Sequence, residues 1–197
     1  MHEQNEVQIS CGFTSLAGVN GSLAYAPGEH VAIQAYGSMH TREIRYLQGA
    51  VGYYTKGKSG LNFEIYAGMG GGNGNDLGYG EEVYVNGDYF LYFAQANFGK
   101  TNLGSAHIDF GLGIKTGIFD AKVIDYTNPV PLHYSNNSLL VEPQAFVRMG
   151  GEKLKAGFQL NGCAIFPVNH QESKLLYYPA IFGLSINYRI APSLRNK

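Results

Sequence analysis

Apolar and polar residues alternate along most of this chain, and the alternation has a period of two. In the segment 180–190, Phe182, Leu184 and Ile186 are separated by glycine or polar residues. The same pattern runs through the segments 61–68 and 106–118. A period of two is typical of β-strands with one apolar and one polar face. The pattern therefore predicts an all-β protein.

The alternating segments predict about ten strands. They fall near residues 6–13, 18–26, 30–40, 43–56, 60–70, 87–99, 104–118, 138–149, 153–166 and 178–190. No linker or low-complexity stretch divides the chain, so we expect a single domain over residues 1–197.

The connections between these strands fall into two alternating classes. Tight turns rich in glycine are expected at 27–29, 57–59, 99–104 and 150–152, and longer loops at 71–86, 119–137 and 167–177. Strict alternation places all short turns at one end of the sheet and all long loops at the other. This asymmetry, with both termini at the turn end, predicts a closed antiparallel up-and-down β-barrel like those of bacterial outer membranes.

Alternation alone does not say which face of the barrel is outside. A soluble calycin-like barrel turns its apolar face inward, whereas a membrane barrel turns it toward lipid. The polar face of this chain carries mostly Gly, Ser, Asn, Gln and Tyr, which suits a narrow lumen better than a soluble surface. Tyrosines near the expected strand ends favour interfacial girdles. They are Tyr25, Tyr53, Tyr177, Tyr178 and Tyr188.

Composition supports this interpretation and excludes other classes. The 197 residues include 27 Gly, 15 Tyr and 11 Phe, and only 15% are charged. A net charge of -1 gives no electrostatic footprint for nucleic acid. The chain contains no run of 18 apolar residues, so no transmembrane helix is predicted. A membrane β-barrel remains possible, because its sequence signal is weaker and alternating. Residues 1–4 show no signal peptide, so either the chain is cytosolic or the numbering begins at a trimmed mature form, and the rest of the sequence favours the second.

Two stretches carry a resemblance to a known family. Residues 21–37 (GSLAYAPGEHVAIQAYG) and 137–146 (NSLLVEPQAF) resemble small outer-membrane barrel proteins, often lipid-anchored, of Bacteroidetes-type bacteria. The resemblance implies a bacterial outer-membrane location and a lipid-modified cysteine before Met1, and it implies no activity. The tail 191–197 departs from the usual ending on an aromatic strand residue.

Candidate catalytic and binding motifs do not meet their chemical requirements. The glycine-rich stretch 68–74 lacks the spacing of a phosphate-binding loop, so its glycines are interpreted as strand glycines. His133 and Ser135 are weak candidates for a base and a nucleophile, with Asp125 as a remote orienting group. His107 and Asp109 share a polar face at the turn end, where a lumen hydrogen bond is expected rather than catalysis. We expect no cofactor and no metal.

The lumen itself is expected to be filled. Gln34, Glu64, Gln144, Gln159 and Arg189 are bulky residues on polar faces, and barrels of about eight strands are just filled by side chains, so we expect no open pore.

The two cysteines are predicted to remain separate. Cys11 falls on an apolar face and Cys163 on a polar face. Because a disulfide needs converging side chains, we expect none between them.

Four charges suggest how two neighbouring strands are aligned. Asp109 and Lys115 have the same spacing as Glu142 and Arg148. One antiparallel register therefore sets Lys115 opposite Glu142 and Asp109 opposite Arg148, and we predict two ion pairs in the lumen.

Two functions follow from these expectations. The first is an outer-membrane barrel with a structural or binding role, whose external loops 71–86 and 119–137 engage a protein partner or a surface glycan. The alternative is an enzyme at the barrel rim acting on lipid-like substrates, or a soluble calycin-like lipid carrier.

Overall fold

In the part of the chain that it describes, the computed structural model consists of β-strands joined by turns. It describes residues 4–15, 18–40, 45–57, 60–77, 84–105, 107–126, 129–168 and 180–190. No helix within these ranges is long and apolar enough to cross a membrane. The strands are β1 (Val7–Thr14), β2 (Gly18–Tyr25), β3 (Val31–His40), β4 (Arg45–Lys56), β5 (Leu61–Leu77), β6 (Tyr84–Leu103), β7 (Ile108–Asp125), β8 (Leu132–Gly150), β9 (Leu154–Gly162), β10 (Ala164–Pro167) and β11 (Ala180–Ile190).

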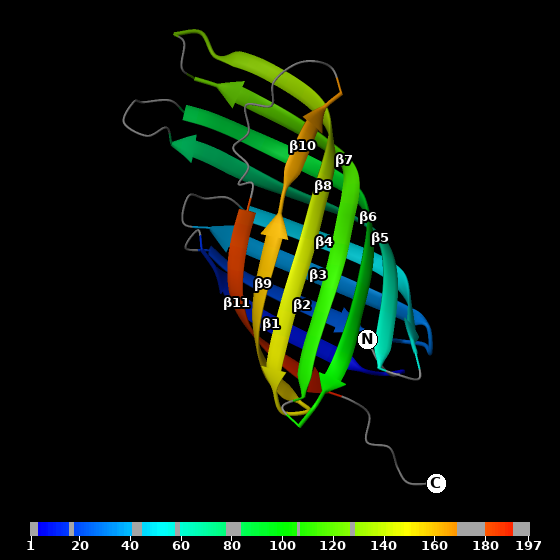
Figure 1. Ribbon diagram of the computed structural model, residues 1–197. Coiled ribbons are helices and arrows are strands. Elements are labelled where there is room, and N and C mark those ends of the chain that lie inside the picture. Colours follow the sequence, from blue (N-terminus) through cyan, green and yellow to red (C-terminus); the bar gives the residue numbers. More distant parts are fainter. Residues whose placement is uncertain are drawn as a thin grey trace.

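The strands form one antiparallel sheet that closes on itself. Each strand from β1 to β8 pairs with the next, β1 also pairs with β11, and β11 pairs with β9. Pairing of β9 with β8 completes the ring. The predicted closed antiparallel up-and-down barrel is confirmed, and Figure 1 shows its tilted strands.

Strands β9 and β10 form one interrupted strand of the barrel wall. Both pair with β8 in the same register, so the wall has the ten strands that were predicted. The interruption at Cys163 lies beside Pro143, which has no N–H for the ladder and stands opposite Gly162 in this register. The sequence interpretation missed this break because it followed side-chain alternation and not the backbone donors.

The prediction of long loops at 71–86 and 119–137 is wrong, because most of these residues belong to strands. Strands β5 and β6 continue in register to Leu77 and Tyr84, and β7 and β8 continue to Asp125 and Leu132. Figure 1 shows the two hairpins extending beyond the shorter strands β1 to β3. Their strand pattern was hidden because glycines replace side chains in 68–74 and because the outward positions above the barrel become polar. We call this end of the barrel the hairpin end and the opposite one the turn end.

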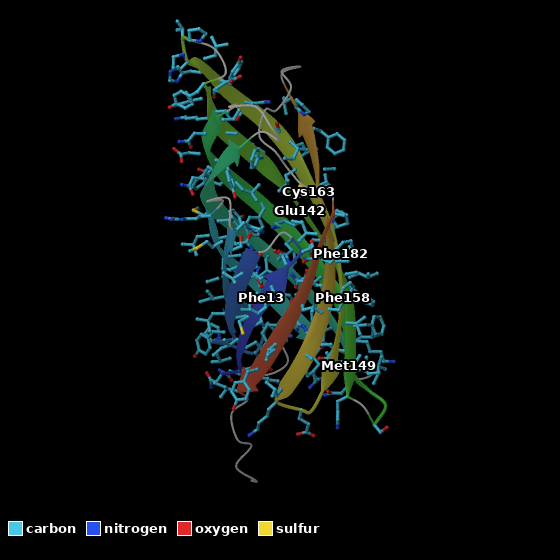
Figure 2. The ribbon with its side chains drawn as sticks, turned by 90° about the vertical axis from the view of Figure 1, so that its left-hand side faces the viewer. Phe13, Glu142, Met149, Phe158, Cys163 and Phe182 are labelled. Atoms are coloured by element: carbon cyan, nitrogen blue, oxygen red, sulfur yellow. The ribbon has the colours of Figure 1, made fainter. Side chains whose placement is uncertain are left out.

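The outside of the barrel is apolar. Every strand of the wall presents large apolar side chains outward, for example Phe13 (69% exposed), Leu184 (65%) and Phe158 (50%). Figure 2 shows the side chains on the barrel turned by 90°, with Phe13, Phe158, Phe182 and Met149 labelled. Of the predicted girdle, Tyr25, Tyr53 and Tyr188 are exposed near the turn end. Tyr177 and Tyr178 lie outside the described residues.

Candidate functional site: the barrel lumen

The inward positions next to the turn end hold a buried polar network. Asp109 on β7 accepts a hydrogen bond from Lys155 Nζ on β9 at 2.6 Å, and both side chains are buried. Lys155 also donates to Asn102 Oδ1 at 3.0 Å, and the backbone N–H of Asn102 donates to Asp109 at 2.9 Å. A buried charge is tolerated when it is paired and hydrogen-bonded, and these contacts supply both.

A second ion pair lies where the first strand, β1, pairs with the last strand, β11. Arg189 Nε on β11 lies 3.1 Å from Glu6 Oε1, and the Glu6 side chain is fully buried. Because Glu6 precedes β1, this pair joins the two ends of the chain inside the barrel.

The middle of the lumen is crossed by amide side chains. Asn97 on β6 donates to Glu64 Oε2 at 3.2 Å and accepts from Gln95 at 2.9 Å and from Gln144 on β8 at 3.2 Å. Gly113 lies between Asn97 and Gln144 on β7, and a Cβ there would lie 2.6 Å from each side chain. The glycine therefore leaves the space in which strands β6 and β8 make contact.

Lys115 bridges the lumen closer to the hairpin end. It forms an ion pair with Glu142 on β8, directly opposite in the register, as the sequence predicted. Its Nζ also donates to Gln48 Oε1 on β4 at 3.4 Å, and Gln48 accepts from Tyr46 Oη at 2.8 Å. Since β4 and β7 are three strands apart, this contact crosses the interior, and Lys115, Glu142 and Gln48 form what we call the lumen bridge.

The second predicted ion pair has a different partner. The register sets Asp109 opposite Arg148 as expected, but the close contact of Asp109 is made with Lys155 from the next strand. The Arg148 guanidinium instead lies 4.4 Å from the centroid of the Phe146 ring. The register determines only which backbone positions are adjacent. The long Lys155 side chain reaches Asp109 across the intervening strand β8. The prediction considered β7 and β8 alone, so it could not include a partner from β9.

Above the lumen bridge, the interior becomes aromatic and apolar. Tyr36, Tyr46, Tyr89 and Phe119 follow one another around the wall, with successive ring centroids 6.3, 5.8 and 5.1 Å apart. We call these four rings the aromatic arc. They come from β3, β4, β6 and β7, and the intervening strand β5 contributes glycines at its inward positions.

The glycines of β5 make room for these rings. A Cβ on Gly70 would lie 2.5 Å from Tyr46 Oη, and one on Gly72 would lie 2.7 Å from the Tyr89 ring. The stretch 68–74, which resembles a phosphate-binding loop only superficially, is therefore part of a strand over which aromatic side chains fold, in agreement with the sequence interpretation.

The lumen contains a cavity of about 520 Å³. The bulky residues predicted for the lumen, Gln34, Glu64, Gln144, Gln159 and Arg189, all line it. At the hairpin end it is bordered by the aromatic arc, by Leu91, Leu140 and Ile165, and by Thr14, Asn20, Ser38 and His40 of strands β1 to β3.

The weak catalytic candidates are not assembled. His133 and Ser135 are exposed on the outer face of β8, whereas Asp125 is buried on the inner face of β7. The Asp125 carboxylate, which would have to orient His133, therefore lies on the opposite face of the sheet. His107 sits in the turn before β7 with a φ of 46°, and Asp109 uses its Oδ1 for Lys155 and Asn102. No group of three metal-ligating side chains occurs among the described residues.

The cysteines occupy opposite faces as predicted. Cys11 is exposed on the outside and Cys163 lines the lumen beside Glu142, and both are free thiols.

Sequence reasoning did not identify Lys155, Glu6 or the aromatic arc as parts of the lumen. A signal for the arc was present, because Tyr36, Tyr46 and Tyr89 occupy polar-face positions of their strands. The hydroxyl makes tyrosine fit a polar face, whereas its ring adds a contact surface that the alternation pattern does not reveal.

Comparison with known proteins adds a distant likeness. No family model matches the chain, and no curated protein matches it. Among solved structures, the chain is similar to the N-terminal β-barrel domain of OprF from Pseudomonas aeruginosa, with 14% sequence identity and a TM-score of 0.42. That match covers 95% of this chain and 98% of the other. The fold described above rests on the strand pairings of this chain itself.

Proposed function

We propose that this chain is a β-barrel of a bacterial outer membrane whose outer face contacts lipid. The observation that carries the proposal is the inverted distribution of side chains. Large apolar residues are exposed around the whole wall, while Asp109, Lys155, Gln95 and Asn62 are buried inside. A soluble barrel minimises such an apolar surface, because exposed apolar patches beyond a few hundred Å² are rare in soluble monomers.

The positions of the outward charges support the same proposal. Arg45, Asp88, Asp120 and Lys122 occupy outward positions of strand segments toward the hairpin end, and Lys100 lies toward the turn end. Between these limits, the outward positions described by the structure carry no charged side chain. An apolar band bordered by charges is the surface expected of a barrel in a bilayer, whose hydrocarbon core is about 25 to 30 Å thick.

We further propose that the barrel is not an open porin and acts through its projecting hairpins β5–β6 and β7–β8. The buried state of Gln48, Gln95 and Lys155 supports a closed lumen, because side chains along an open channel would be exposed to water. The outer face of the hairpins is polar, with Asp88, Lys122 and His133 among its exposed residues. Such a surface suits a protein partner or a surface glycan. The resemblance to lipid-anchored Bacteroidetes-type barrels fits this role and adds no activity.

The absence of a pore is tested by single-channel recording. Purified protein inserted in planar bilayers should give no large, steady conductance, because the lumen bridge and the polar networks cross the interior. Replacing Lys115 and Gln48 together with alanine removes the bridge and serves as the matched comparison. Large steady conductance from the unmodified protein would contradict the closed lumen.

The role of the hairpins is tested by shortening one of them. A variant in which residues 122–135 are replaced by a two-residue Asn-Gly turn keeps the register of β7 and β8 and removes the projecting part. On surface polysaccharide from the producing bacterium, immobilised for plasmon resonance, the intact barrel should bind and the shortened barrel should not. Equal binding of both, or binding by neither, would contradict a glycan-binding role of this hairpin.

A further inference from the structure

The hairpin end of the lumen differs chemically from the rest of the interior. Lumens of membrane barrels are polar, yet Leu91, Phe119 and Leu140 face inward here and are buried among one another. Tyr46, Tyr89 and Ile165 pack against this cluster and also border the cavity. An apolar interior wall next to a cavity is the usual construction of a small-molecule site.

Strands β1 to β3 supply hydrogen-bonding groups at the same end of the cavity. The cavity is bordered there by the short strands β1 to β3 through Thr14, Asn20, Ser38 and His40. His40 Nε2 lies 3.4 Å from Thr14 Oγ1, and within the described residues His40 Nδ1 is buried without a hydrogen-bond partner. A buried ring nitrogen without a partner loses free energy that a ligand hydroxyl restores.

The lumen bridge forms the floor of this space. Lys115 and Glu142 neutralise each other there, and Lys115 Nζ also lies 5.4 Å from the centroid of the Phe93 ring. Because the floor carries no net charge, a charged ligand would lose its hydration without gaining a free counter-charge. The site therefore favours an uncharged molecule.

We propose that the hairpin end of the lumen binds a small, uncharged aromatic molecule that carries a hydroxyl group. Its ring would lie along the aromatic arc, since aromatic rings with centroids about 4.5 to 7 Å apart attract each other in offset or edge-to-face geometry. Its hydroxyl would reach His40, which lines the same end of the cavity on strand β3. A ligand site goes beyond the structural role proposed above, and it rests on that proposal only in that the barrel is embedded in lipid.

The proposal is tested with 2-naphthol and the whole protein in lipid nanodiscs. The chain has 15 Tyr and no Trp, so energy transfer from tyrosine to bound naphthol is measured without tryptophan background. Titration should saturate, whereas empty nanodiscs should show only linear partitioning. Phe119→Ala and His40→Ala should each weaken binding about tenfold or more, equivalent to about 1.4 kcal/mol. Phe182→Ala, on the lipid face, is the matched control and should leave binding unchanged.

Two competitors separate the contributions to binding. Naphthalene, which lacks the hydroxyl, should compete weakly and to the same extent in the unmodified protein and in His40→Ala. The anion 2-naphthoate should compete more weakly than 2-naphthol, because the floor is neutral. If Phe119→Ala does not fold, Leu140→Phe narrows the same space without adding an indole and should abolish saturation.

Several results would overturn the inference. They are linear uptake equal to that of empty nanodiscs, or equal affinity in Phe119→Ala, His40→Ala and Phe182→Ala. A protein that shows heat-modifiable gel mobility in the nanodisc and yet binds no naphthol contradicts the ligand site alone. A protein that never folds in lipid contradicts the outer-membrane proposal instead.

Discussion

At the scale of single residues, the lumen is held by charges that reach beyond their register partners. Asp109 stands opposite Arg148, yet it pairs with Lys155, and Lys115 contacts both the adjacent β8 and the distant β4. Such pairs stabilise a fold only when their polar atoms are satisfied, because desolvation of both ions opposes their attraction. The hydrogen bonds from Asn102 to Asp109 and from Lys155 to Asn102 meet that requirement.

Double-mutant cycles distinguish the observed pair from the register pair. Asp109→Asn combined with Lys155→Met should show a coupling free energy of about 1 to 3 kcal/mol, the upper range for contacting residues. Asp109→Asn combined with Arg148→Met should show a smaller one. The measurement is urea-induced unfolding in lipid vesicles. Stronger coupling of Asp109 to Arg148 than to Lys155 would mean that the observed pairing is wrong.

At the scale of elements, the glycines of strand β5 are explained by the aromatic rings that pack over its inner face. Its inward glycines allow Tyr46 and Tyr89 to stack with centroids 5.8 Å apart over the strand that separates their own. A β-strand made of glycine is weak in isolation, because glycine loses the most backbone freedom on folding. Stacking of the flanking aromatics and the long ladder to β6 compensate for this weakness.

A pair of glycine substitutions tests this account of β5. A Cβ on Gly72 would collide with the carbonyl oxygen of Arg45 and approach the Tyr89 ring, whereas a Cβ on Gly49 of β4 would meet nothing within 4 Å. Gly72→Ala should therefore destabilise the barrel by about 1 to 3 kcal/mol, the usual cost of overpacking. Gly49→Ala should leave the free energy of unfolding nearly unchanged. Equal stability of the two variants would contradict the role of the glycines.

Sequence alternation predicted the barrel elements well where one face was apolar and the other polar. The register of β7 and β8 followed from Asp109, Lys115, Glu142 and Arg148, because charges on the inner face have few favourable alignments. Alternation failed where that contrast disappeared, in the glycines of 68–74 and in the polar outer face of the hairpins. The aromatic arc was not predicted, since it depends on rings from four strands that meet only after the barrel closes.

At the scale of the whole molecule, the outer face sets the environment in which the barrel is stable. Leu184 lies in the middle of β11, with Phe13 and Phe158 opposite it on the two neighbouring strands. In the proposed outer-membrane setting, a cation at this position would face hydrocarbon. Leu184→Arg should therefore destabilise the barrel in vesicles by about 2 to 4 kcal/mol, the cost of arginine near the bilayer midplane.

The matched control lies on the same outer surface beyond the apolar band. Ser135 is exposed on the outer face of the β7–β8 hairpin, so Ser135→Arg should change the free energy of unfolding by less than about 0.5 kcal/mol. If both arginine variants are as stable as the unmodified protein, position 184 does not face lipid.

The position of the bilayer is tested most directly by tryptophan fluorescence in vesicles that contain brominated lipid. Because the chain has no Trp, single substitutions at Ile114 (outward in the apolar band), Asn20 (lining the lumen) and Ser135 (outward on the hairpin) each report one environment. Bromine on the acyl chains quenches only indoles close to it. The account predicts strong quenching for Ile114→Trp and little for Asn20→Trp and Ser135→Trp. Unquenched emission from Ile114→Trp in a folded barrel, or a folded protein that stays monodisperse in buffer without detergent or lipid, would contradict a lipid-facing outer surface.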